Sequence, residues 1–130
     1  MDTGASPPFA ALIGLEIIDV MPERAVARMK IRPEFCNRNG VAAGGVLMAL
    51  ANTLGTVATM ANLRIGTNTI TTESATNFIA SLPVGDMAHA ECNLVHDGEE
   101  MMVWQTKIMR GDGRLAAIVT QTQVIRSAGQ

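Results

Sequence analysis

A long and almost uninterrupted apolar segment in the middle of the chain constrains the fold most. The segment Gly45–Leu63 contains no charged residue, and three of its five polar residues, Asn52, Thr56 and Thr59, stand at positions i, i+4 and i+7. This spacing predicts a helix with one weak polar stripe. A helix that is apolar on nearly all other sides must be enclosed by the rest of the protein. Because polar residues interrupt the segment, we expect a buried core helix and not a membrane span.

Segments typical of β-strands lie on both sides of this helix. We expect a short helix at 9–13 and strands at 15–20, 24–32, 67–80, 87–95, 99–110 and 114–126. Short glycine-containing turns at 97–98 and 111–113 predict that the last three strands form an antiparallel meander. One long helix against one antiparallel sheet is an α+β arrangement. At this length, residues 1–130 are expected to form a single domain.

The outer face of the expected sheet predicts association between subunits. A single helix covers only one face of a sheet, so the other face meets water or another chain. The residues that we assign to the outer face are apolar: Val95, Met101, Val103, Leu115, Ala117 and Val119. We therefore expect an obligate oligomer.

Composition and charge exclude several functions. The formal net charge is -2 and no basic cluster is present, so nucleic acid is not an expected partner. The N-terminal residues lack the pattern of a secretory signal, which predicts a cytoplasmic protein, not bound to membranes, with Cys36 and Cys92 as free thiols. No spacing of His, Cys, Asp and Glu suits a metal site. We expect neither a metal nor a cofactor.

The start of the central helix carries the clearest chemical signal. Gly44 and Gly45 open the helix, where bare backbone N–H groups and the helix dipole favour negative charge. Such a terminus can act as an oxyanion hole. Close packing of the helix against a strand would explain the same two glycines, and the sequence leaves both interpretations open.

This region resembles the hotdog thioesterases of the phenylacetate-degradation type. Their loop and helix run Asn-x-x-Gly-x-x-His-Gly-Gly and then, seven residues past the last Gly, Asp or Glu. The matching residues here are Asn37, Gly40, Gly44 and Gly45. Ala43 stands at the position of His, and Asn52 stands at the position of the acid. Residues 72–79 and 83–86 also resemble a strand and turn of that family, so the resemblance covers nearly the whole chain.

The resemblance implies a fold, an assembly and an activity. It implies a hotdog fold, in which a sheet of about five to six antiparallel strands wraps one long helix. It implies a homodimer or homotetramer that hydrolyses acyl-CoA at a site between two subunits. In the enzymes that it resembles, the N–H at position 44 meets the thioester carbonyl, and Asn at position 37 places water or substrate. Positions 43 and 45 line the substrate site, and the acid at position 52 acts as base or nucleophile.

Two departures from the family pattern bear on the chemistry. The Asn52 carboxamide has no basic lone pair that takes a proton at neutral pH, so the central group of the mechanism is missing. Glu99 and Glu100 follow a hairpin at which many relatives carry Arg or Lys that meets a coenzyme A phosphate. Glu73 is a candidate substitute base, because strict alternation places it on one face with Thr71. It would otherwise be an ordinary solvent-facing glutamate.

Three functions fit these residues to different degrees. An acyl-CoA thioesterase-like protein, with catalytic candidates Asn37, Gly44, Asn52 and Glu73 and substrate contacts at Ala43 and Gly45, fits best. A non-catalytic protein that binds an acyl thioester or another small ligand is the alternative. A hotdog hydratase would need a His that works with an acid, and no His lies near the helix start.

Overall fold

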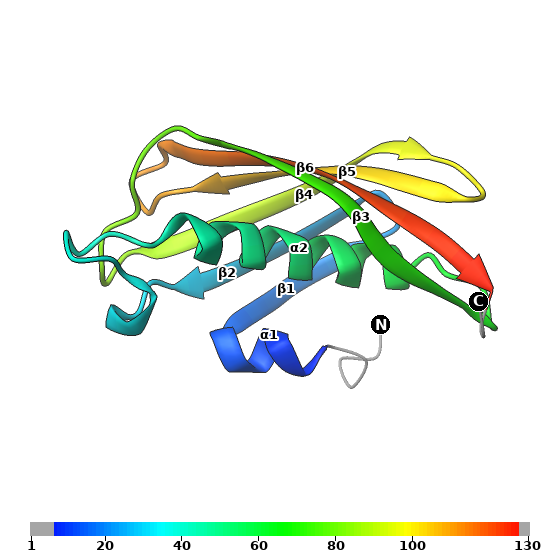
Figure 1. Ribbon diagram of the computed structural model, residues 1–130, viewed down its shortest axis with the longest axis horizontal. Coiled ribbons are helices and arrows are strands. Elements are labelled where there is room, and N and C mark those ends of the chain that lie inside the picture. The colour runs from blue at the N-terminus through cyan, green and yellow to red at the C-terminus, as the bar shows by residue number, and fades with distance from the viewer. Residues whose placement is uncertain (1–6, 128–130) are drawn as a thin grey trace.

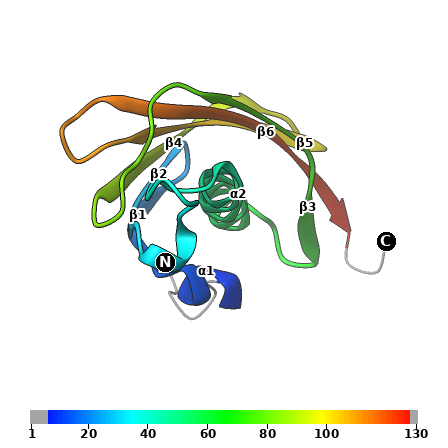
Figure 2. The same ribbon diagram turned by 60° about the vertical axis from the view of Figure 1, so that its left-hand side comes forward.

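The computed structural model describes residues 7–127, and within them one long helix is enclosed by a curved antiparallel sheet (Figure 1). The helix is α2 (Gly44–Met60), and the sheet arches over it when the molecule is viewed nearly along the helix axis (Figure 2). The α+β architecture with a single long helix, predicted from the sequence, is confirmed.

The described residues form one sheet of six strands, and all neighbouring strands are antiparallel. Its strands are β1 (Leu15–Met21), β2 (Arg24–Lys30), β3 (Thr67–Phe78), β4 (Met87–Asp97), β5 (Met101–Met109) and β6 (Leu115–Ser127). The strand order is β1-β2-β4-β5-β6-β3, so the predicted meander of the last three strands is confirmed. Strand β3 forms one edge of the sheet, beside β6. It also packs against α2 (Figure 1). The remaining elements are α1 (Pro8–Ile13) and a short turn of 3-10 helix, η2 (Pro33–Phe35).

The core lies between α2 and the concave face of the sheet. On α2, Leu50 and Leu54 are fully buried, and they meet a sheet face that is rich in alanine. Small side chains on the sheet let the helix come close, and Trp104 is the largest fully buried side chain of the described residues. The expectation of an enclosed helix is confirmed, since nine of its 17 residues are buried.

The predicted outer face of β6 is wrong for Ala117 and Val119, whereas the half-buried Leu115 pairs with Met109 of β5. Ala117 and Val119 are completely buried and face α2, together with Gln121 and Gln123. Glutamines at alternate positions of a strand usually face water, so Gln121 and Gln123 are exceptions to the common pattern. Here their amides reach polar atoms of α2 and β3 instead. On the neighbouring strands Val95 and Met101 are exposed, as expected.

The helix packs tightly against the sheet at Gly55. A Cβ atom at this position would overlap the side-chain amide of Gln121, which has no exposed surface. We therefore expect Gly55→Ala to lower the free energy of unfolding by about 1 kcal/mol or more, although Ala is the better helix former. Urea unfolding measures the effect. Gly45→Ala is the matched control, because nothing lies within 4 Å of its new methyl group. Equal stability of the two variants would contradict this view of the contact.

Candidate functional site at the start of the central helix

The first turn of α2 presents unpaired backbone donors to the surface. The N-cap residue Ala43 has extended backbone angles and offers no side-chain cap to the helix. Gly44 and Gly45 are both exposed, and their N–H groups have no acceptor among residues 7–127. Orphan N–H groups at a helix start attract negative charge, and the helix dipole strengthens this attraction.

The loop before α2 is held in place by backbone hydrogen bonds. Ala42 N–H donates to the Leu82 carbonyl at 2.8 Å, and Ala43 N–H donates to the Phe35 carbonyl at 2.9 Å. These bonds fix the direction in which the chain enters the helix. The motif glycine Gly40 has a φ of 73°, a left-handed conformation that favours glycine.

Asn37 shapes this loop with its own side chain. Its Oδ1 accepts a hydrogen bond from the Asn39 N–H at 2.9 Å, and its carbonyl accepts one from the Gly40 N–H at 3.1 Å. The amide oxygen is thus occupied within the loop, while the exposed Nδ2 group stays available to a ligand. The structure therefore assigns Asn37 a conformational role in the loop beside any contact with substrate.

A hollow of about 320 Å³ lies beside the start of the helix. It is lined by Ala42, Gly44, Leu47 and the segment from Phe78 to Leu82. The ring of Phe78 covers Gly44 closely, because a Cβ at Gly44 would lie 3.0 Å from the ring Cζ. Both interpretations of this glycine therefore hold: it permits close packing, and it leaves its N–H open. Ala43, half-buried next to the hollow, supplies no polar side-chain atom.

Asn52 lies on the same helix but far from its start. It follows Gly44 by eight positions, which is about 12 Å along the helix axis. One small reacting group cannot touch both positions in a single chain. The Asn52 side chain is also exposed, not buried among apolar residues.

Two threonines donate hydrogen bonds to Asn52, and Gln123 in turn bonds to Thr71, one of them. Thr71 Oγ1 donates to Asn52 Oδ1 at 2.8 Å, and Gln123 Nε2 donates to Thr71 Oγ1 at 2.6 Å. Thr56 Oγ1 donates to the Asn52 carbonyl at 2.9 Å. Sequence reasoning missed Gln123 as part of this site. The pair of glutamines at alternate positions of an apolar strand was the available signal, since a buried amide requires hydrogen-bond partners.

Comparison with known proteins decides the family. The model of the family described as the thioesterase superfamily matches residues 39–117, which is more than half of the chain. The chain belongs to the thioesterase superfamily. A Mycobacterium tuberculosis protein named "Putative esterase Rv1847" is 26% identical over 113 residues, which cover 85% of this chain and 80% of that protein.

Solved structures of this superfamily share the fold. The Escherichia coli PaaI protein from the phenylacetic acid degradation operon superposes with a TM-score of 0.85 at 21% identity, covering 95% of this chain and 86% of that one. A hypothetical thioesterase protein of Streptococcus pneumoniae with coenzyme A gives 0.80 at 22% identity, covering 89% and 88%. The hotdog fold predicted from the sequence is therefore confirmed.

The predicted orientation of Glu73 within this superfamily site is wrong. Strand β3 carries a bulge, because Thr71 pairs with Gln123 whereas Glu73 pairs with Thr122 on β6. Cross-strand partners share a face, so Thr71 faces α2 and Glu73 faces the outer side of the sheet. The single extra residue in the bulge reverses the strict alternation expected from the sequence. Glu73 is exposed, and the structure does not bring it to the start of α2.

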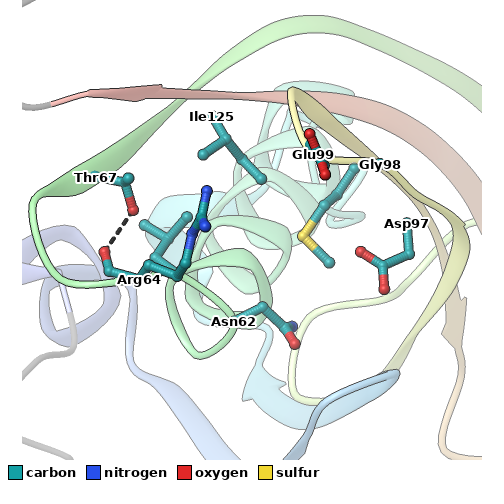
Figure 3. A pocket seen from close by; sticks show the side chains of 9 residues that line it. Asn62, Arg64, Thr67, Asp97, Gly98, Glu99 and Ile125 are labelled. Carbon is teal, nitrogen blue, oxygen red and sulfur yellow. Dashed lines mark hydrogen bonds between the residues drawn. The ribbon is translucent and has the colours of Figure 1, made fainter.

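A second hollow, of about 390 Å³, lies at the other end of α2 (Figure 3). It is lined by Asn62, Leu63, Arg64, Thr67, Asp97, Gly98, Glu99, Met102 and Ile125. Arg64 comes from the segment after α2, while Asp97 ends β4 and Glu99 lies in the turn between β4 and β5. The lining therefore carries both signs of charge, and its negative charges come from the hairpin at which relatives are expected to carry cations.

Other reactive groups of the described chain lie outside these hollows. Cys36 and Cys92 are free thiols, as predicted. Burial raises the pKa of Cys92 to about 11, so this thiol stays protonated near neutral pH.

Among residues 7–127, no group of three or more His, Cys, Asp and Glu side chains is placed to hold a metal ion. In the same part of the chain, no helix has the length and apolar character needed to cross a membrane.

Proposed function

We propose that the protein is an acyl-CoA thioesterase-like hydrolase that holds the thioester carbonyl oxygen at the N–H groups of Gly44 and Gly45. The observation that carries the proposal is the uncapped, exposed helix start beside a hollow, in a chain of the thioesterase superfamily. Donors placed where charge develops in the tetrahedral transition state are a major source of catalysis in acyl transfer. The hollow beside Phe78 offers apolar surface to the acyl group.

Asn52 makes this proposed hydrolase a slow one. A carboxamide binds a water molecule by hydrogen bonds but does not accept its proton near neutral pH. General-base assistance typically contributes about 10²–10⁴-fold to the rate. Without it, hydrolysis depends on the donors at the helix start and on the positioning of substrate.

The proposal requires two copies of the chain. Gly44 and Asn52 are too far apart to act together in one chain, so a second chain has to bring its position 52 to the helix start of the first. Strand β3 offers the means, because its edge away from β6 pairs with no strand among the described residues. Such an open edge is a template for pairing with another chain. Antiparallel pairing of two β3 edges would set the start of each strand against the end of the other.

Dimer formation is a direct prediction of this arrangement. We expect the protein to be a dimer, or a dimer of dimers, at micromolar concentration, because half of each site would otherwise be missing. Light scattering coupled to size-exclusion chromatography gives the mass in solution. A stable monomer that hydrolyses thioesters would contradict the shared site.

We propose that coenzyme A carries the acyl group, and that the charges of the second hollow weaken its binding. The Streptococcus pneumoniae protein has a structure with coenzyme A, and a Streptococcus mutans protein has one with acetyl-CoA. In this chain Arg64 is the basic residue that lines the second hollow, while Glu99 would repel a phosphate there. Salt and exposure make this repulsion modest. We therefore expect a weaker affinity for coenzyme A than a basic residue at position 99 would give.

A non-catalytic binding protein is the second candidate, and Asn52 is the observation that favours it. Loss of the acid, of the His at position 43 and of the hairpin cation would together leave a site that binds and does not turn over. Release of free thiol from acyl-CoA separates the two candidates.

The cytoplasmic location that we expect from the sequence stays a prediction.

A further inference from the structure

The wall of the hollow beside the start of α2, here called the first hollow, is held from outside by Arg110. Residues 79–82 of this wall belong to no helix or strand, so their position depends on contacts with other segments. The first two N–H groups of this stretch donate to the Ala116 carbonyl at 2.8 and 3.0 Å. Arg110, in the turn between β5 and β6, donates from Nη1 to the Ser81 carbonyl at 3.1 Å. The turn and the wall lie at the same end of the sheet (Figure 1).

The guanidinium of Arg110 is fixed in place within its own turn. Its Nη2 forms an ion pair with Asp112 at 3.2 Å, and Asp112 Oδ1 accepts a hydrogen bond from the N–H of Arg114 at 3.0 Å. Only 22% of the Arg110 side chain is exposed. A planar guanidinium that two acceptors hold has little freedom to move, and its donors keep a fixed direction. Arg110 is therefore an anchor for the Ser81 carbonyl and not a freely solvated surface charge.

The anchored wall in turn holds the loop that enters α2. The Leu82 carbonyl follows that of Ser81 in the chain and accepts a hydrogen bond from the Ala42 N–H at 2.8 Å. Leu82 is buried and lines the first hollow together with Ala42. Ala43, the next residue, is held by a different segment, because its N–H donates to the Phe35 carbonyl. Loss of the anchor is therefore expected to loosen Ala42 and to leave Ala43 in place.

We propose that Arg110 is a positioning residue that sets the shape of the first hollow and thereby the acyl length that the hollow accepts. Arg110 is not among the residues that line the hollow, so it acts through Ser81 and Leu82. None of the described lining residues has a charged side chain, which suits an uncharged alkyl chain. A two-carbon group held at Gly44 is too short to depend on the whole wall, whereas a longer chain packs along it. The ligand in this inference rests on the proposed function, and the positioning rests on the hydrogen bonds alone.

The positioning is tested without a ligand by hydrogen exchange. Arg110→Met keeps an unbranched apolar stem and removes the donors. We expect the Ala42 N–H to exchange about 10-fold faster in this variant and the rate at the Ala43 N–H to change by less than about 2-fold. Arg114→Met, which removes an exposed cation from the same turn, is the matched control and is expected to change neither rate. An unchanged rate at Ala42, or equal acceleration of both amides, would overturn the positioning.

The effect on the acyl group is tested by the binding of S-octyl-CoA and S-ethyl-CoA, two thioethers that cannot be hydrolysed. We expect Arg110→Met to bind S-octyl-CoA about 10-fold more weakly than the native protein, and S-ethyl-CoA within about 2-fold, because only the longer chain needs the intact wall. Calorimetry measures both affinities. Arg110→Lys keeps one donor for the Ser81 carbonyl, so we expect it to recover part of the octyl affinity. Equal losses for the two ligands would overturn the role in selecting acyl length.

These outcomes are separable from those that test hydrolysis, because neither measurement needs turnover. Absence of thiol release from every acyl-CoA would overturn the proposed hydrolysis and leave the exchange and binding results standing. If the native protein bound neither thioether, the acyl-CoA ligand and the selection of acyl length would both be overturned, while exchange at Ala42 would still decide the positioning.

Discussion

Replacing Asn52 with Asp is expected to raise the rate of thioester hydrolysis by about 10-fold or more. Asn and Asp have nearly the same shape, and only the carboxylate accepts the proton of an attacking water. The surroundings suit the change, because Thr71 donates to Oδ1 in either case and leaves the second carboxylate oxygen free. The gain stays below the full effect of a general base, since Ala43 and Glu99 also depart from the family pattern.

The sequence alone suggests that a charge at position 52 would be expensive to bury. The structure corrects this, because Asn52 is exposed in the described chain and the carboxylate keeps contact with water. We therefore expect only a small loss of folding free energy in Asn52→Asp.

The assay is thiol release from acyl-CoAs of differing acyl length, with native and variant proteins at equal folded fraction. Glu73→Gln is the matched control, since this outward-facing carboxylate is not expected to affect turnover. If Asn52→Asp gains nothing with any acyl-CoA, the site does not present a thioester to position 52. The non-catalytic binding function would then be the better account.

A methyl group at Gly44 is expected to remove most of the activity of Asn52→Asp. The new Cβ would lie 3.0 Å from Cζ and 3.2 Å from Cε1 of Phe78, so the ring and the methyl group together would occupy the approach to the N–H. Loss of one oxyanion donor typically costs about 10²–10³-fold, and we expect a fall of about 100-fold in Asn52→Asp/Gly44→Ala.

Gly45→Ala separates this effect from a general change in the helix. Its methyl group would have nothing within 4 Å, and Ala is the better helix former at both positions. We expect the two alanine variants to unfold at similar urea concentrations, because the half-exposed Phe78 ring has room to shift. Equal activity of the two variants would show that the thioester does not approach Gly44.

Periodicity was sufficient to predict the helix and all six strands of the described chain. The helix signal was strong because an uncharged segment of this length is either enclosed or membrane-bound, and Asn52, Thr56 and Thr59 argued against a membrane. The meander followed from glycine-containing turns. Boundaries differed by a few residues only, as at the end of α2, which stops at Met60 and not at Leu63.

The direction in which side chains point was harder to predict. One bulge between Thr71 and Glu73 reversed the faces of the residues that follow it on β3, and no sequence signal marks this bulge. On β6 the inward Gln121 and Gln123 imitated a solvent-facing pattern. Strict alternation fails in both cases because tertiary hydrogen bonds and local register decide the face.

The candidate site could be predicted only where it is local in sequence. The loop from Asn37 to Gly45 is one continuous motif, so its residues were found directly. The hydrogen bonds around Asn52 join residues that are distant in the sequence. Thr71 follows Asn52 by 19 positions, and Gln123 follows Thr71 by 52 positions. Such contacts depend on which strands become neighbours, and β3 beside β6 is a pairing that the order of strands in the sequence does not reveal.

The most direct measurement of the central claim is a crystal structure with a non-hydrolysable thioether analogue of an acyl-CoA. The account predicts the acyl chain in the hollow beside Phe78, with the reacting carbon next to the N–H groups of Gly44 and Gly45. It also predicts that the Asn52 side chain of a second copy of the chain lies next to this reacting carbon, either directly or with one water molecule between them. Density for the analogue away from the start of α2, or a bound monomer with position 52 remote from the ligand, would contradict it.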